Sequence, residues 1–284
     1  MTLRSSQIRL LSHSVLHVVL IAGSLLMVIP LLWTLSTSLK SIQQISVWPP
    51  EWIPDPVMWS NYVEVFKAVP VLLWLRNSLV IVAANVVGSV VTCSFVAYGF
   101  ARLRFPGRDA LFLLMLSTLM MPYIVRLIPL YVLYNQVGWI NTFLPVTVPQ
   151  LLARNPFFIF LLRQFFMGIP DDLSDAARID GANEFQIWWR IVMPLSKPAL
   201  AAVAIFAFRD AWDNFLAPLV YMAGRPDLRP LAVGLYTLRG GGGQLPDTHY
   251  LMALSTLMII PMLLMFALGQ RYFIRGVTLT GLKG

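Results

Sequence analysis

Charged residues are scarce in this sequence, and cysteine and histidine are scarcer still. Only 12% of the 284 residues are charged, which is about half the share of an ordinary soluble domain. The single cysteine, Cys93, excludes an internal disulfide and a metal site built from several cysteines. His13 and His17 stand four residues apart without a second cluster of ligands, so we expect no metal site. The phosphate-binding pattern G-x-x-x-x-G-K-S/T is also absent, which excludes ATP hydrolysis by this chain alone.

Hydrophobic residues, by contrast, make up 58% of the chain and gather in long runs. A helix needs roughly 20 apolar residues to cross a bilayer, and backbone groups in hydrocarbon must be paired within the helix. The sequence therefore predicts an all-α integral membrane protein with six transmembrane helices. We place them at 14–39, 73–100, 109–135, 143–167, 197–223 and 248–270.

The basic residues are distributed unevenly between the two sides of these spans. With the N-terminus in the cytoplasm, twelve of the 21 Lys and Arg residues lie on the cytoplasmic side, six lie outside and three fall within spans. The three within spans are Arg126, Arg154 and Arg209. This bias favours both termini inside. The net charge of +8 then reflects topology and contact with membrane lipid, and we expect no nucleic-acid partner.

The longest polar interruption on the predicted cytoplasmic side runs from Pro170 to Leu200 and reads PDDLSDAARIDGANEFQIWWRIVMPLSKPAL. Acidic residues at its start suit a helix N-terminus, and Gly181 permits a sharp change of backbone direction. Beyond the glycine, apolar residues recur at the spacing of one helix face: Phe185, Trp188, Trp189 and Val192. The pattern predicts two short helices joined at Gly181. Taken alone, it is equally typical of an amphipathic helix that lies on the membrane.

This stretch resembles the EAA loop, by which membrane subunits of bacterial ABC importers dock onto their ATPases. Further segments resemble the carbohydrate-uptake subfamily, and in particular the smaller membrane subunit of the maltose transporter. They are FFIFLLRQFF at 157–166, QRYFIRG at 270–276 and GLKG at 281–284. The resemblance implies the type I ABC importer permease fold, divided into a cytoplasmic segment 1–13, a six-span domain 14–274 with its coupling loop at 171–193, and a cytoplasmic tail 275–284.

The resemblance also implies residues that couple the subunit to its ATPases. The family's leading Glu is Asp175 here, which keeps the charge but shortens its reach. In the family, the alanine-rich helix lies in a cleft of the ATPase with its bend nearby. Carried onto this sequence, the coupling residues are Asp175, Ala176, Ala177, Asp180, Gly181, Ala182, Phe185 and Pro194.

The partners implied by the resemblance are a second membrane permease subunit, two ATPases and an extracytoplasmic solute-binding protein, in a bacterial inner membrane. ATP and Mg²⁺ would be bound by the ATPases, with no cofactor in this chain. The glycine-rich stretch Gly240, Gly241, Gly242, Gly243 and Gln244 would contact the binding protein. A plain linker explains the same composition.

A charged cluster in the fifth predicted span, FRDAWDNFLAPL, is a candidate substrate pathway, because charge within a membrane is costly. Arg209 and Asp213 are four residues apart, so they can pair on one helix face. Asp210 and Asn214 then lie on a neighbouring face with Trp212 nearby, a combination of polar groups and an aromatic platform that suits sugars. A purely structural cluster between helices is the alternative. The family usually has Trp-Asn-Asp or Trp-Asn-Glu where this chain has Trp212-Asp213-Asn214.

The third predicted span carries Pro122 and Pro129 around Arg126. Proline kinks a helix and frees backbone carbonyls, so this span either is simply kinked or lines the pathway.

Among functions, we expect a sugar or oligosaccharide permease subunit. The alternatives are a permease for another solute, such as an amino acid or a glycerol phosphodiester, and an integral membrane enzyme.

Overall fold

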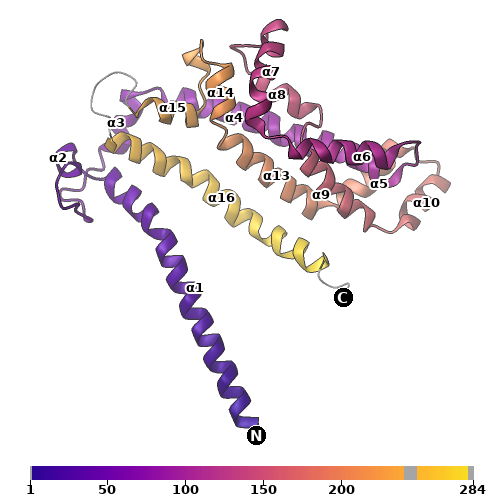
Figure 1. The fold of residues 1–284 in the computed structure, drawn as a ribbon, viewed down its shortest axis with the longest axis horizontal. Helices are drawn as coiled ribbons and strands as arrows, with labels where there is room; N and C mark the ends of the chain where they lie inside the picture. The colour runs from indigo at the N-terminus through magenta and orange to yellow at the C-terminus, as the bar shows by residue number, and fades with distance from the viewer. Residues whose placement is uncertain (1, 240–247, 281–284) are drawn as a thin grey trace. The chain divides into compact units, whose positions relative to one another are not determined.

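The computed structural model describes residues 2–239 and 248–280, and every regular element in this part of the chain is a helix (Figure 1). The chain divides into two compact units. The first unit comprises Met1–Val69 and Leu235–Ile260, and the second comprises Pro70–Gly234 and Pro261–Gly284. The functional residues discussed below lie in the second unit.

The first unit contains α1 (Thr2–Ser38), α2 (Ile42–Ile45), α3 (Asn61–Ala68) and the beginning of α16 (Thr248–Thr280). The segment that follows α1 folds around the buried Lys40. The Lys40 ammonium lies 4.1 Å from the centroid of the Trp33 ring and donates to the carbonyl of Glu51 at 2.5 Å. The Asn61 amide donates to the carbonyls of Ser38 and Lys40, at 2.9 and 3.0 Å. These bonds fix the start of α3.

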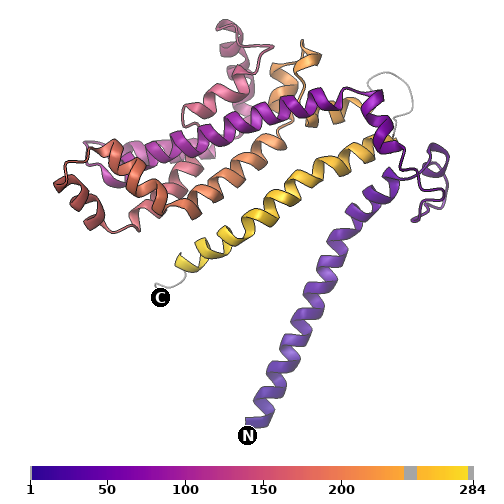
Figure 2. The ribbon, with the colours of Figure 1, turned by 180° about the vertical axis from the view of Figure 1, so that it is seen from behind.

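The longest element of the second unit is a rod made of α4 (Val71–Gly88), the π-helical turn η1 (Ser89–Cys93) and α5 (Ser94–Arg102) (Figure 2). The rod packs along α4 against α8 (Leu144–Leu151) and α13 (Lys197–Trp212), and along α5 against α9 (Pro156–Met167). Gly88 allows α4 and α8 to approach closely, because a Cβ there would lie 2.9 Å from the carbonyl oxygen of Gln150. The rod therefore organises the helices around it.

Within residues 2–239 and 248–280, three helical segments are long and apolar enough to cross a membrane: His13–Ser38, Val71–Arg102 and Thr248–Gln270. Two bent pairs bring the number to five if each pair counts as one span. One pair, bent by 101°, joins α6 (Arg108–Ser117) and η2 (Thr118–Met120) to α7 (Tyr123–Gln136). The other, bent by 84°, joins α11 (Glu184–Ile187), η3 (Trp188–Val192) and α12 (Met193–Leu195) to α13.

The predicted fourth span, 143–167, is broken into α8 and α9, and neither helix is long enough by itself to cross a membrane. Ala153 has a positive φ of 53° and ends the first helix, while its amide donates to the Thr92 hydroxyl on η1 at 3.1 Å. Asn155 then caps α9 by accepting from the amide of Phe157 at 3.1 Å. The break thus depends on local capping and on a neighbouring helix, neither of which hydrophobicity reveals.

The third and fifth predicted spans are also interrupted. The third changes direction between η2 and α7, where Pro122 precedes the new helix, whereas Pro129 is accommodated inside α7. The fifth ends at Trp212 and resumes as α14 (Leu216–Tyr221). We attribute the first of these breaks to the fixed backbone angle of proline and its missing amide hydrogen.

The segment after α14 is attached to the beginning of α4. It contains η4 (Pro226–Leu228) and α15 (Leu231–Thr237). The Asn77 amide donates to the carbonyls of Asp227 and Arg229 at 2.8 and 3.0 Å, and the Ser78 hydroxyl accepts from the amide of Leu231 at 2.8 Å. These three bonds hold the segment before α15 on the rod.

Candidate coupling loop and substrate cavity

The polar stretch identified in the sequence folds as α10 (Asp171–Ile179), a tight turn, and the helical limb α11–η3–α12. Gly181 has a φ of +84°, in the left-handed region. Its amide donates to the carbonyl of Arg178 at 3.0 Å, and the amide of Ala182 donates to the carbonyl of Ala177 at 2.9 Å. This is the Schellman pattern, which ends a helix with a glycine. The predicted pair of short helices joined at Gly181 is confirmed.

The turn is closed by side chains on both of its sides. Asn183 and Gln186 form a capping box, in which each side chain accepts from the other residue's backbone amide, at 2.9 and 3.0 Å. The guanidinium of Arg178 donates to Asp175 at 2.6 Å and to Glu184 at 2.8 Å, so one cation joins α10 to α11. This contact lowers the pKa of Glu184 and raises that of Arg178. The loop is a preformed structure.

Apolar residues fix the far limb of the loop to the spans. Ile187, Trp188 and Val192 are buried in a core shared with α5, α9 and α13. The predicted apolar stripe is wrong in part, because Phe185 and Trp189 remain 58% and 53% exposed. The π-helical turn at Trp188–Val192 adds a residue to the helix turn and shifts the buried face.

The near end of the loop is fixed by Arg102 at the end of α5. Its guanidinium pairs with Asp171 and donates to the carbonyl of Phe166 at 2.7 Å. With both ends attached to the spans, movement of the loop must move the spans as well. That is the mechanical property of a coupling element.

The predicted coupling residues have different surroundings. Asp175, Ala176, Asp180 and Gly181 are exposed, whereas Ala177 and Ala182 are half-buried against the core. Phe185 and Pro194 are exposed. The loop also exposes Ile179, at 87%, and Leu173, at 44%, which sequence reasoning did not single out.

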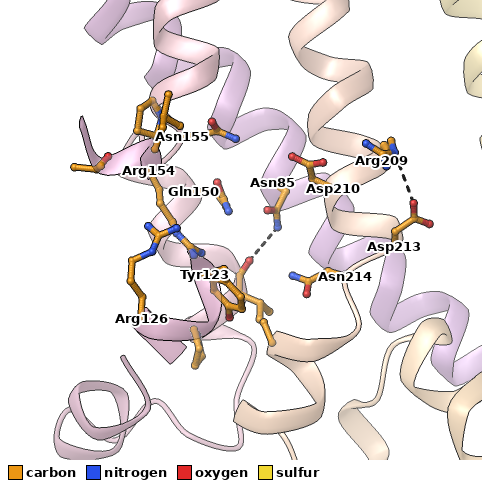
Figure 3. Close-up of a pocket in the computed structure, with 16 residues that line it drawn as sticks. Asn85, Tyr123, Arg126, Gln150, Arg154, Asn155, Arg209, Asp210, Asp213 and Asn214 are labelled. Carbon is orange, nitrogen blue, oxygen red and sulfur yellow. Dashed lines mark hydrogen bonds and ion pairs between the residues drawn. The ribbon is translucent and has the colours of Figure 1, made fainter. Parts of the chain in front are cut away.

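A polar cavity of about 520 Å³ opens among the helices of the second unit (Figure 3). The rod, η2, α7, α8, the 152–155 break, α13 and the turn that follows α13 all contribute to it. Its lining consists of Asn85, Thr118, Leu119, Tyr123, Arg126, Pro145, Val146, Gln150, Arg154, Asn155, Pro156, Arg209, Asp210, Asp213, Asn214 and Ala217. The broken helices thus place polar side chains at the level of the spans, as is common where transporters line a water-filled path.

Four of the five predicted pathway residues line this cavity: Arg209, Asp210, Asp213 and Asn214. Arg209 and Asp213 form the predicted ion pair, with their nearest atoms 3.9 Å apart. Trp212 is the exception, because it is buried and stacks on Phe208 at a centroid distance of 5.6 Å. The aromatic ring that lines the cavity is instead that of Tyr123.

Arg126 belongs to the third predicted span, for which lining of the pathway was one of two alternatives, and it does line the cavity. Arg154 also lines the cavity and was not predicted as a pathway residue. The sequence carried a signal for them, since both stand inside apolar runs that were assigned as spans. Their convergence depends on the bend before α7 and on the break after α8. The predicted binding-protein contact, Gly240, Gly241, Gly242, Gly243 and Gln244, lies outside the described residues and stays a prediction.

A helical membrane protein with interrupted spans, a polar cavity at their level and a loop fixed at both ends defines a transporter subunit. Comparison with known proteins specifies the class. The chain belongs to the family of binding-protein-dependent transport system inner membrane components, which it matches over residues 57–279.

Three relatives illustrate the family. The arabinooligosaccharides transport system permease protein AraQ of Halalkalibacterium halodurans is 38% identical over 81% of this chain and 81% of its own. The osmoprotective compounds uptake permease protein GgtD of Synechocystis sp. is 37% identical over 78% of this chain and 74% of its own. The sn-glycerol-3-phosphate transport system permease protein UgpE of Yersinia enterocolitica is 34% identical over 92% of this chain and 94% of its own.

The fold agrees with a solved structure. A chain of a bacterial ABC transporter involved in the import of the acidic polysaccharide alginate matches with a TM-score of 0.81 at 24% identity, over 91% of this chain and 95% of that chain. The protein is therefore an ABC importer permease with the type I fold, a transport component rather than an enzyme. An importer of this family works with ATPases and a binding protein.

Proposed function

We propose that this permease forms half of the translocation pathway for a sugar or oligosaccharide, and that the solute passes through the cavity around Asp210 and Asn214. The observation that carries this proposal is the lining of the cavity. Amide, carboxylate, hydroxyl and guanidinium groups surround a space beside the Tyr123 ring. A polyhydroxylated solute needs both donors and acceptors to replace its hydration, and an aromatic ring to contact its apolar face.

The names of the relatives support this solute class. AraQ is named for arabinooligosaccharides, and UgpE for sn-glycerol 3-phosphate, which also carries hydroxyl groups. The match to each extends over most of both chains, so it includes the residues that line the cavity.

For energy coupling, we propose that the loop 171–193 lies in the cytoplasm, where its exposed part seats in an ATPase. Asp175, Ala176 and Asp180 offer charge and small side chains there, and Ile179 and Phe185 offer apolar contacts. ATP and Mg²⁺ belong to the ATPases. When these close on ATP, the loop is displaced, and its anchors at Asp171 and Trp188 move the spans as a rigid body.

The assembly that we propose contains a second permease subunit, which we take to be a different chain, two ATPases and an external binding protein. Both termini of this chain then lie in the cytoplasm, as the distribution of basic residues favours. The partner permease supplies the other half of the pathway. The solute is released inside when the two halves change their access.

The test is ATP-dependent uptake by the complete transporter in proteoliposomes. Radiolabelled mono- and oligosaccharides are compared with amino acids and short peptides, with a non-hydrolysable ATP analogue as the control. We expect uptake of at least one saccharide or other polyhydroxylated solute that requires both ATP and the binding protein. Uptake confined to amino acids or peptides would refute the sugar assignment and leave the permease assignment intact.

A further inference from the structure

The charges of the cavity are arranged asymmetrically. Arg209, Asp210 and Asp213 come from α13 and the turn that follows it, where the Arg209–Asp213 pair neutralises two of the three charges. Arg126 on α7 and Arg154 in the break after α8 line the opposite wall (Figure 3). Among the described residues, no carboxylate oxygen lies within ion-pair distance of either guanidinium.

The two arginines converge on one aromatic ring. The Arg154 guanidinium lies 5.8 Å from the centroid of the Tyr123 ring. Arg126 is three residues after Tyr123 on α7, on the same helix face. The Nε atom of Arg126 is buried and has no hydrogen-bond partner. This wall therefore holds two positive charges and at least one unused donor.

Two like charges on one wall repel each other, and charged residues within membrane spans usually face a cavity and pair with an opposite charge. Guanidinium groups offer several donors in a planar fork, which suits the oxygens of a carboxylate or a phosphate. A carboxylate or a phosphate group is therefore the kind of ligand that would suit this wall.

We infer that Arg126 and Arg154 bind an anionic group of the transported solute, so that the permease selects acidic sugars, either uronates or phosphate esters, over neutral ones. This inference rests on the proposed function and narrows it. The acidic end of the solute lies at Arg126 and Arg154, beside Tyr123. Its hydroxyl groups extend toward Asn214 and Asp210, where the carboxylate accepts from hydroxyls and repels a second anion.

The experiment uses the saccharide identified by the uptake assay above, together with its matched counterparts: the neutral sugar, the uronate and the phosphate ester of the same length. Initial uptake rates are measured in proteoliposomes for the wild type and for Arg126→Gln, Arg154→Gln and the two Arg→Lys variants. Arg76→Gln, an exposed arginine on α4 outside the cavity, is the matched control. Co-purification of the partner permease verifies assembly for every variant.

We expect the wild type to take up one of the acidic sugars at least about tenfold faster than the neutral one, since hydrogen bonds to charged groups contribute about 1.5–3 kcal/mol each. Faster uptake of the uronate would show that the two arginines prefer a carboxylate, and faster uptake of the phosphate ester would show that they prefer a phosphate. Each Arg→Gln variant should lose about tenfold or more of the acidic uptake without losing neutral uptake. The Lys variants should keep part of the preference, and Arg76→Gln all of it.

Three results would overturn the inference and still leave the sugar permease standing. The wild type could prefer the neutral sugar, or the Arg→Gln variants could lose neutral and acidic uptake equally. A third result is loss of the partner permease from the Arg→Gln variants, which would show that the arginines pair with a carboxylate of that subunit. If the proposed function itself is wrong, the proteoliposome uptake assay described under Proposed function will already show no uptake of any saccharide.

Discussion

The hydroxyl of Tyr98 donates a hydrogen bond of 2.5 Å to the carboxylate of Glu184. Tyr98 belongs to the α5 part of the rod, and Glu184 is the first residue of α11 in the coupling loop. The same carboxylate accepts from Arg178 at 2.8 Å. A single side chain thus joins the span, the near limb of the loop and the far limb. It gives the loop a direct contact with the rod, which a movement of the loop would use if the loop couples ATP hydrolysis to the spans as proposed.

The first prediction concerns this contact. Tyr98→Phe should leave the ATPases bound but lower the number of solute molecules transported per ATP hydrolysed. The substitution removes the hydrogen bond to Glu184, so a displacement of the loop is transmitted less fully to α5. A hydrogen bond to a charged group contributes about 1.5–3 kcal/mol, so we expect a decrease of several-fold. The measurement is the ratio of uptake to ATP hydrolysis in proteoliposomes.

Tyr62→Phe is the matched control for that experiment, because it removes a hydroxyl that is bonded at 2.7 Å to Ser38, in the first unit. It should leave the ratio unchanged. An unchanged ratio in Tyr98→Phe as well would show that the bond to Glu184 carries no coupling.

The second prediction concerns the turn at Gly181. Its φ of +84° is unfavourable for any residue with a Cβ, although no atom lies within 4 Å of a Cβ built there. Gly181→Ala should therefore strain the loop by about 1 kcal/mol without a steric clash, and weaken ATPase binding. Gly138→Ala is the control, because Gly138 has a φ of +71° and equally open surroundings far from the loop in sequence. Equal ATPase affinity in both variants would argue against a role of the turn in docking.

Comparison of sequence and structure shows why this loop was predictable. Gly181, the acidic helix start and the alanines are local features, and the chain folds them locally. The break at 152–155 was missed because Leu151 and Leu152 continue an apolar run, whereas the break depends on the hydroxyl of Thr92, about sixty residues earlier. Trp212 was misplaced for a different reason: its ring is buried and stacks on Phe208, four residues earlier on the same helix, and so does not face the cavity.

Individual cavity residues were predicted only on the side that one helix supplies, although the third predicted span was left as either kinked or lining the pathway. Arg209 and Asp213 are four residues apart, so their pairing follows from helix geometry. Arg126 and Arg154 come from elements that are separated by a bend and a break. No periodicity relates two such residues, and only their position inside apolar runs marked them.

The third prediction is a pH dependence. The pKa of Glu184 is lowered from its ordinary value of 4.5, chiefly because Arg178 donates to its carboxylate. A carboxyl group of this kind contributes stability above its ordinary pKa, and that contribution is lost as pH falls through the folded-state value. Hydrogen exchange in the loop should therefore be protected equally at pH 8 and pH 6, with protection falling only as the pH drops below the ordinary value of 4.5.

The variant Glu184→Gln checks the origin of that dependence. Its loop should be less protected than the wild type at neutral pH, and the difference should vanish in acid. If the difference persists at acid pH, the ionised carboxylate is not what stabilises the loop.

The fourth prediction concerns the contact of α4 with α8. A side chain at Gly88 would meet the backbone of Gln150, which cannot move as a flexible side chain does. Gly88→Leu should displace the α8 wall of the cavity and destabilise the protein by about 1–3 kcal/mol. Solute uptake should fall while the ATPases remain bound, and the thermal midpoint in detergent should decrease. Gly99→Leu, where no atom lies within 4 Å of the added Cβ, is the control and should change neither.

The central claim is that the loop 171–193 transmits the work of ATP hydrolysis to the spans. It is tested most directly by co-purifying the ATPases with wild type, Asp175→Lys and Gly181→Asp in detergent, followed by uptake and ATP hydrolysis in proteoliposomes. We predict that wild type retains the ATPases, and that each substitution either releases them or leaves hydrolysis without uptake. Retention of the ATPases together with full uptake in both variants would contradict the account.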